Sequence, residues 1–163
     1  MDDEARKRLL KEIEILRSRV AILEQAEAER KRAEQALWES DFTLRAIIDY
    51  ATDVIYIKDR EGRYILINPA GAEYFGCGTN AIVGKRDADL FRPEEARQMM
   101  AMDQRVMASG APISYEARRT FRETTRVFLT TKFPYVSPRG ETLGVIGISR
   151  DITERQQEQE ALR

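Results

Sequence analysis

Apolar side chains in the first third of the chain recur at alternating steps of four and three residues, separated by charged positions. This spacing is the a/d seam of a coiled coil, in which Lys, Arg and Glu occupy the other helix faces. The seam consists of Leu9, Ile13, Leu16, Val20 and Leu23. We therefore expect residues 1–40 to form a long helix that pairs with a second copy of the chain, in a parallel or an antiparallel arrangement.

The hydrophobic pattern changes its period after residue 40. Residues 41–51 predict a short amphipathic helix, and beyond them runs rich in β-branched and aromatic residues alternate with turn signals. Composition follows the same division, because all nine glycines and all five prolines lie after position 61. The predicted strands cover residues 54–57, 64–67, 113–121, 126–136 and 143–152. The helical segments predicted between the second and third strands are residues 70–75, a turn near 81–83, a segment through 90–91 and residues 93–109.

This order of elements predicts an α+β fold, a five-stranded antiparallel sheet with helices on one face. Asn68 followed by Pro69 indicates the start of a helix, and Gly76 and Gly110 indicate the ends of two helices. The prediction of this fold therefore rests on capping signals as well as on hydrophobic periodicity.

Three segments follow from these patterns. Residues 1–40 form the coiled-coil helix, residues 41–153 form the folded domain, and residues 154–163 begin a C-terminal linker helix. Residues 154–163 also repeat the Glu, Arg, Ala and Leu pattern of residues 29–38. Similar helical connectors at both ends are typical of one module in a serial array, so we expect the natural polypeptide to continue.

Composition and charge exclude several classes of function. The chain has 27 Lys and Arg against 28 Asp and Glu, so its net charge of -1 provides no global field for nucleic acid, and we expect no nucleic-acid partner. One cysteine and no histidine exclude disulfides, Cys/His zinc sites and catalytic triads. No apolar run reaches the roughly 18 residues that span a bilayer, and the acidic start is not a signal peptide. We expect a cytoplasmic segment that does not itself enter the membrane.

Four segments of the chain carry a family resemblance. These are residues 52–55 (TDVI), 58–63 (KDREGR), 68–70 (NPA) and, most specifically, 144–155 (GVIGISRDITER). Over about residues 41–155 the sequence resembles a bacterial PAS domain. The resemblance implies a sensory and dimerising module of histidine kinases, diguanylate cyclases, phosphatases or transcription regulators. It also implies that the chain is not itself an enzyme and that a histidine kinase or diguanylate cyclase domain lies outside it.

The resemblance also implies a ligand pocket between the sheet and the helices. Strand alternation and helical spacing predict which side chains form its walls. The predicted walls are Ile55, Ile57, Ile65, Ile67, Phe75, Phe91, Met99, Met102, Val106, Phe128, Thr130, Ile146 and Ile148. The same residues would also form a packed core that holds no ligand.

Signal coupling is expected where the last strand becomes a helix. Asp151 and Thr153 are natural acceptors for the first free amides of that helix. The resemblance further implies that Asp151 pairs with a basic residue near the first hairpin, for which Lys58 and Arg63 are the matching positions.

Arginines gather on or beside the third and fourth predicted strands and the turn that follows them. We interpret them as a solvated rim of the sheet, with a clamp for an anionic ligand as the alternative. They are Arg118, Arg119, Arg122, Arg126 and Arg139.

Cofactor chemistry has few candidate residues. The single thiol, Cys77, lies in the segment FGCGT, which does not match the NCRFL-type segment of flavin-photoadduct PAS domains. We expect no cofactor and no metal; haem is not expected without histidine, and a non-covalent flavin stays open. The leading interpretation is a homodimeric relay that senses a small molecule or partner. The alternatives are a structural dimerisation spacer with a filled core and a flavin-binding photosensor or redox sensor.

Overall fold

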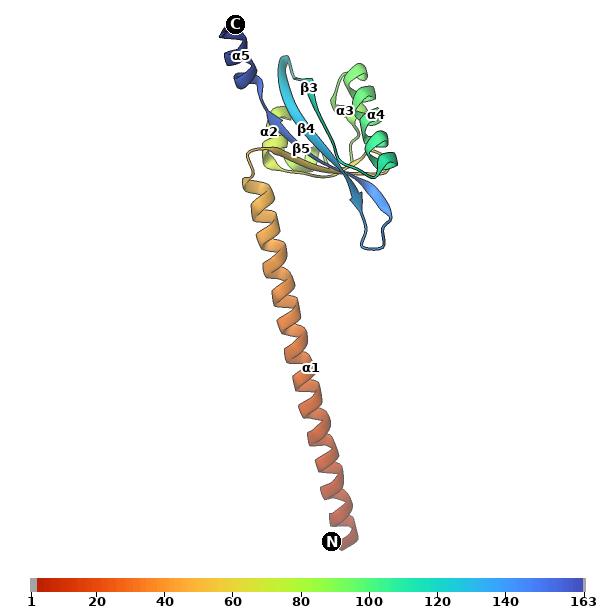
Figure 1. Cartoon of the computed structure of the whole chain (residues 1–163). Helices are drawn as coiled ribbons and strands as arrows, with labels where there is room; N and C mark the ends of the chain where they lie inside the picture. Colours follow the sequence, from red (N-terminus) through yellow and green to blue (C-terminus); the bar gives the residue numbers. More distant parts are fainter. Residues whose placement is uncertain (1–2, 163) are drawn as a thin grey trace. The chain divides into compact units, whose positions relative to one another are not determined.

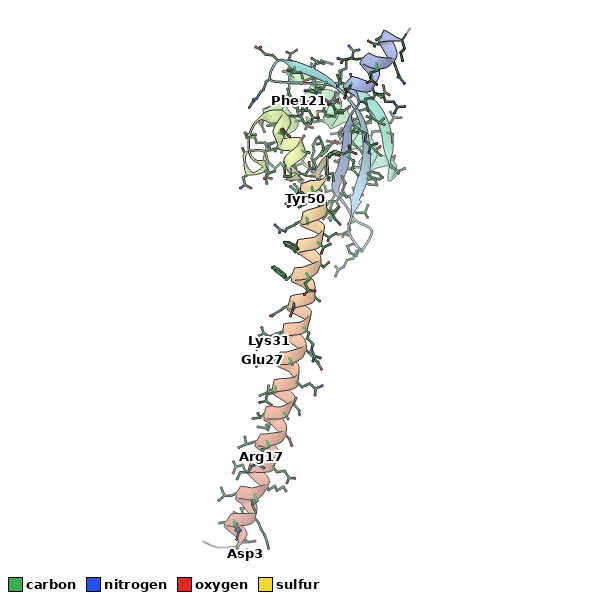
Figure 2. The ribbon with its side chains drawn as sticks, turned by 90° about the vertical axis from the view of Figure 1, so that its left-hand side faces the viewer. Asp3, Arg17, Glu27, Lys31, Tyr50 and Phe121 are labelled. Carbon is green, nitrogen blue, oxygen red and sulfur yellow. The ribbon has the colours of Figure 1, made fainter. Side chains whose placement is uncertain are left out.

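The N-terminal third of the chain is a single helix. The computed structural model describes residues 3–162, in which α1 runs without a break from Asp3 to Tyr50. No described residue of α1 is buried, and its side chains project outward along the whole helix (Figure 2). Ion pairs one turn apart, such as Lys31 with Glu27 at 2.9 Å, support the exposed helix. The helix expected over residues 41–51 is present as far as Tyr50, but it is the end of α1 and not a short helix of its own, because no Gly or Pro interrupts the chain before Gly62.

Two compact units divide the described chain between Ala46 and Ile47. The second unit contains the sheet and the remaining helices. Its strands are β1 (Val54–Asp59), β2 (Tyr64–Ile67), β3 (Ile113–Phe121), β4 (Thr124–Val136) and β5 (Thr142–Asp151). Its helices are α2 (Pro69–Phe75), the 3-10 helix η1 (Thr79–Ala81), α3 (Asp87–Leu90), α4 (Pro93–Ser109) and α5 (Thr153–Ala161).

The five strands form one antiparallel sheet in the order β2-β1-β5-β4-β3. Helices α2, α3 and α4 cover one face of this sheet (Figure 1). The predicted α+β architecture is therefore confirmed. The last strand, β5, lies in the centre of the sheet, so a displacement of any neighbouring strand reaches the residues that lead into α5.

Asn68 ties several segments of the domain together. Its side chain is fully buried, and its Oδ1 accepts from the amides of Ile55 (3.0 Å) and Gly71 (3.1 Å). Its Nδ2 donates to the carbonyls of Ile48 (3.1 Å) and Asp53 (2.9 Å). Asn68 is thus the predicted cap of α2 and also fixes the end of α1 and the start of β1 within this unit.

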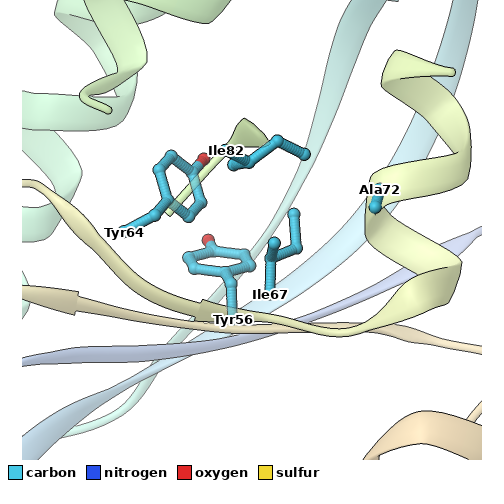
Figure 3. Close-up of a cluster of buried hydrophobic side chains, with 5 residues drawn as sticks. All are labelled: Tyr56, Tyr64, Ile67, Ala72 and Ile82. Atoms are coloured by element: carbon cyan, nitrogen blue, oxygen red, sulfur yellow. The ribbon is translucent and has the colours of Figure 1, made fainter. Parts of the chain in front are cut away.

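The covered face of β1 carries Tyr56 and Lys58, since alternate residues of a strand point to opposite faces. Tyr56 lies over Gly147 of β5, where an added Cβ would come within 2.1 Å of the tyrosine ring. Tyr56 and Ile67 rise from the sheet toward Tyr64 and Ile82, and these residues with Ala72 form the buried cluster in Figure 3.

Candidate functional site

A cavity of about 40 Å³ lies between the covered face of the sheet and helices α2–α4. It is larger than the roughly 10–15 Å³ that one water needs and far smaller than the about 300–1,000 Å³ of sites for drug-sized ligands. Its walls are Val54, Tyr56, Tyr64, Ile67, Gly71, Tyr74, Phe75, Phe91, Met99, Tyr115, Arg119, Phe121, Phe128, Thr130 and Ser149. The interior is therefore mostly filled but leaves room for a small molecule.

The structure places some of the predicted wall residues on this cavity and others elsewhere. Those on the cavity are Ile67, Phe75, Phe91, Met99, Phe128 and Thr130. Val106 is fully buried in α4 but does not line the cavity, and Met102 lines a surface groove between α4 and β3. Ile65 is half exposed, beside an irregularity in the pairing of β1 with β2.

Four predicted wall residues lie on the wrong face of the sheet. Ile55 pairs with Ile148, and Ile57 pairs with Ile146, on the face opposite to the cavity. The expectation that they face the helices is wrong, because alternation defines two faces and does not say which one the helices cover. Here the covered face carries the tyrosine and the lysine, and the isoleucines form the open face.

The end of the cavity nearest α2 is aromatic. Phe75, Phe91, Phe121 and Phe128 pack edge to face, with ring centroids 5.0–5.8 Å apart. Tyr74 joins this group, with its ring 5.2 Å from Phe128. Such pairs stabilise the core beyond the area they bury, and they give this end of the cavity a dry surface.

The opposite wall carries polar groups. The hydroxyls of Thr130 and Ser149 lie 2.9 Å apart and share a hydrogen bond. Burial, followed by the nearby carboxylates, raises the pKa of Tyr56 and of Tyr64 well above the usual range, so both phenols stay neutral. The cavity is therefore apolar at one end and supplied with hydroxyl groups at the other.

Next to this polar wall lies a fully buried ionic cluster, which we call the ionic quartet: Lys58, Asp87, Asp103 and Lys132. Lys58 Nζ donates to Asp87 at 2.5 Å and to Asp103 at 3.0 Å. Lys132 Nζ donates to the other oxygen of Asp103 and to the Met99 carbonyl. Asp87 and Asp103 come from α3 and α4, and the lysines come from β1 and β4, so the quartet joins the helix layer to the sheet.

The cavity is connected to the C-terminal helix through Tyr74. The ring of Tyr74 lines the cavity, and its hydroxyl donates to Asp151 Oδ2 at 3.1 Å. Asp151 Oδ1 accepts from the Thr153 amide at 2.9 Å and from its hydroxyl at 2.5 Å. Thr153 Oγ1 in turn accepts from the Val127 amide at 2.9 Å. The first residue of α5 is therefore held by both the sheet and the cavity wall.

Charge and hydrogen bonding keep Asp151 ionised. Burial alone would raise its pKa, but hydrogen bonds from Thr153 and Tyr74 and the charge of Arg126 outweigh it, so the pKa lies below the usual range. Arg126 Nη1 lies 3.1 Å from Asp151 Oδ2. Burial, and then the carboxylate, raise the pKa of Tyr74 to about 12, so Tyr74 stays a hydrogen-bond donor at neutral pH.

The basic partner of Asp151 differs from the one that the resemblance implied. Lys58 belongs to the ionic quartet, and Arg63 donates to the Gly84 carbonyl at 3.1 Å. Lys58 pairs with Val145, six residues before Asp151 on β5, which is about 20 Å along a strand. Neither of the two implied residues can reach Asp151.

Tyr74, Asp87 and Asp103 are functional candidates that the sequence pattern did not indicate, and Arg126 was expected in the arginine rim but not as a partner of Asp151. Helical spacing would place Tyr74 beside Phe75 on α2, but only the fold brings its hydroxyl to a residue 77 positions away. The arginines predicted as a solvated rim differ in exposure. Arg119 is buried, with 8% of its surface exposed, whereas the side chain of Arg126 is 45% exposed.

Three further features of residues 3–162 bear on function. Cys77 is exposed. The acidic and thiol side chains described there form no cluster of the kind that holds a metal ion. No helix in the same range combines the length and apolar character needed to cross a membrane.

Comparison with known proteins relates the chain to sensory proteins. Residues 48–157 match the family described as the PAS fold. The chain is 32% identical over 120 residues to the methanogenesis regulatory histidine kinase FilI of Methanothrix harundinacea, an alignment that covers 74% of this chain and 14% of that protein. It is 28% identical over 130 residues to a diguanylate cyclase of Vibrio cholerae, covering 77% of this chain and 40% of that protein.

A solved structure shows the same similarity. The PAS domain from Bordetella pertussis BvgS superposes with a TM-score of 0.61 at 32% identity, covering 76% of this chain and 94% of that one. By contrast, the chain spans well under two thirds of the length of the two curated relatives. The similarity is therefore to a domain of larger proteins.

Proposed function

The chain belongs to the PAS-fold family, and from this premise we propose that it senses a small molecule in its cavity and relays binding to helix α5. The relay is Tyr74–Asp151–Thr153. The observation that carries the proposal is the double position of Tyr74: its ring lines the cavity, and its hydroxyl donates to the carboxylate that accepts from the first amide of α5. A molecule that displaces the Tyr74 ring also moves the start of the C-terminal helix.

The relatives support a regulatory role for the signal. The similar proteins include a histidine kinase and a diguanylate cyclase, and the alignments cover a minor part of each. We propose that this segment senses and does not catalyse, and that the output is an effector domain of the same kind outside it. Its coupling to α5 requires only a small difference in the angle or stability of the first helical turn.

Helix α1 supports a dimeric form of this sensor. Its seam residues are exposed in the single chain by 45–68%. Pairing of two copies through this seam would bury them, and the coiled coil would then bring two sensing domains and their outputs together. The mostly filled interior also agrees with the second interpretation, in which the chain is a dimerisation spacer. The relay experiment below distinguishes a spacer from a sensor.

Replacing Asp151 by alanine is expected to loosen α5 without unfolding the sheet. The variant removes the acceptor of the Thr153 amide and hydroxyl, and each such hydrogen bond contributes about 0.5–1.5 kcal/mol. Hydrogen exchange of the amides in residues 153–157 should accelerate about tenfold or more. The Tyr74→Phe variant, which loses one contact to Asp151, should show a smaller increase of about fivefold.

Tyr135→Phe is the control, because Tyr135 lies on β4, outside the cavity wall. Each variant is also fused to a diguanylate cyclase domain after residue 163, and the cyclase activity is compared with that of the wild-type fusion. A relay predicts altered activity for Asp151→Ala and Tyr74→Phe only. Equal activity in all four fusions would favour the spacer.

The purified protein is expected to be colourless. Flavin and haem belong to the size class of drug-sized ligands, and the cavity of about 40 Å³ is too small for either without rebuilding the core. Absorption should show only the near-ultraviolet band of Trp38 and the tyrosines, and Cys77→Ala should leave it unchanged. A stoichiometric flavin or Soret band after purification would contradict this expectation.

A further inference from the structure

Arg119 is a buried cation on the wall of the cavity. It projects from the covered face of β3 and is 8% exposed. Its Nη1 donates to the Arg118 carbonyl at 2.8 Å. Within residues 3–162, no carboxylate oxygen lies within 4.0 Å of its guanidinium, whereas buried charges are ordinarily paired.

The other interior cations do have partners. Lys58 and Lys132 face Asp87 and Asp103, so the ionic quartet contains two positive and two negative groups. Glu95 of α4 uses one oxygen to accept from the Thr120 amide at 3.0 Å, and its other oxygen is buried without a hydrogen-bond partner and forms no ion pair with Arg119. Among the described residues, the guanidinium on the cavity wall therefore has no carboxylate within ion-pair distance.

The surroundings of Arg119 define the chemistry that this charge can recognise. Tyr115 and Arg119 both line the cavity and the groove beside it, and the guanidinium opposes the rise that burial causes in the pKa of Tyr115. Thr130 and Ser149 add hydroxyl groups to the same wall. A guanidinium presents paired donors that match the two oxygens of a carboxylate. Nearby hydroxyl groups can donate further hydrogen bonds to the same carboxylate.

The rest of the cavity limits the body of such an anion. Phenylalanine rings make up much of its remaining lining, among them Phe121 two residues from Arg119 on β3, and they offer no polar partner. The volume of about 40 Å³ restricts the occupant to a few non-hydrogen atoms. A carboxylate with a short hydrocarbon tail fits both limits, while a dicarboxylate would place its second charge among the aromatic rings.

A surface groove lies next to the cavity at the same arginine. The groove between α4 and β3 shares Tyr115 and Arg119 with the cavity, so these two side chains separate the interior from the surface. Arg105 and Arg118 also line this groove, and together with Arg119 they outnumber its one carboxylate, Glu116. Their charges favour the approach of an anion over that of a cation.

We propose that the cavity binds a short-chain monocarboxylate, with its carboxylate on the guanidinium of Arg119 and its hydrocarbon tail among the phenylalanines. The anion supplies the negative charge that the wall lacks, and its tail comes to lie beside Tyr74. The inference rests on the proposed function only in taking this cavity as the sensing site.

The test is a titration of the full chain with sodium propionate, followed by two-dimensional amide NMR. Propionamide, which has the same shape without the charge, and sodium chloride at the same ionic strength serve as comparators. We expect saturable shifts at Tyr115, Arg119 and Thr130 with propionate. We expect propionamide to bind at least tenfold more weakly, since charge-assisted hydrogen bonds are about twice as strong as neutral ones.

Variants locate the binding site. Arg119→Met keeps most of the apolar stem, and it should weaken propionate binding by about 10–100-fold. Arg119→Lys keeps the positive charge but lacks the paired donors of a guanidinium, so its affinity for propionate should lie between those of Arg119→Met and the wild type. Arg139→Met, in the exposed turn between β4 and β5, should bind propionate like the wild type.

Three outcomes would overturn the proposal: no saturable shift with propionate over the millimolar range, equal binding of propionamide, or undiminished binding by folded Arg119→Met. If Arg119→Met does not fold, the comparison of propionate with propionamide on the wild type decides the question alone. The relay experiment on Asp151 and Tyr74 uses no carboxylate, so its outcome is independent of this one.

Discussion

Replacing Asp103 by asparagine is expected to destabilise the folded domain by about 3–5 kcal/mol, the usual cost of breaking a buried ion pair. Asp103 is the carboxylate partner of Lys132 and the second partner of Lys58, and both lysines are fully buried. The variant leaves two buried ammonium groups with one carboxylate between them. Denaturation with urea, followed by near-ultraviolet circular dichroism, measures the loss, because tyrosines in the core report on this region.

Two comparisons make the result specific. Arg97→Met breaks an exposed ion pair on the same helix, in which Arg97 and Glu94 are 70% and 69% exposed, and should cost less than about 1 kcal/mol. The double variant Asp103→Leu with Lys132→Met removes one charge of each sign and keeps the pair of Lys58 with Asp87. It should be more stable than Asp103→Asn alone. A loss no larger for Asp103→Asn than for Arg97→Met would show that the quartet is open to water.

Replacing Ile13 and Val20 by aspartate is expected to abolish dimerisation at micromolar concentration. The two side chains are 45% and 51% exposed in the single chain, and complete burial of such a residue contributes about 1.5–3 kcal/mol. Loss of both in each chain, together with the burial of charge that pairing would then require, should weaken association by at least about a hundredfold. Sedimentation velocity of the wild type and the double variant gives the two masses.

A matched control lies on a different face of the same helix. Lys11→Glu and Glu14→Lys change charges at positions that neither belong to the seam nor line the groove along it, and they leave all five aliphatic seam residues in place, so dimerisation should survive. An unchanged mass in the Ile13 and Val20 variant, or a monomeric wild type, would remove α1 as the source of dimers.

Local signals were enough to predict most of the fold. Helix caps such as Asn68 and Gly110 act through neighbouring backbone groups, so the bounds of α2 and α4 follow from adjacent residues. The strands follow from β-branched runs between turns. Residues 41–50 are helical as expected but continue α1, because the change in hydrophobic pattern near residue 41 is not accompanied by a helix-breaking residue.

The site depends on relations that sequence patterns do not carry. Ile55 and Ile57 are more hydrophobic than Tyr56 and Lys58, so the hydrophobic pattern predicted that the isoleucines face the helices. In the structure Tyr56 and Lys58 are the buried pair. Lys58 is buried only because Asp87 and Asp103 meet it from two helices, at separations of 29 and 45 residues. Long-range partners of this kind become visible only when the topology brings them together.

The sharing of Asp103 by two lysines has a consequence for how this domain can diverge. Since Asp103 serves both Lys58 and Lys132, drift at one of the three positions alone leaves an unbalanced charge in the interior. We expect substitutions at these positions to be tolerated in combinations that keep the ionic quartet neutral, so the positions should vary together among related domains. Arg119 lies outside the quartet, so we expect it to vary independently of them.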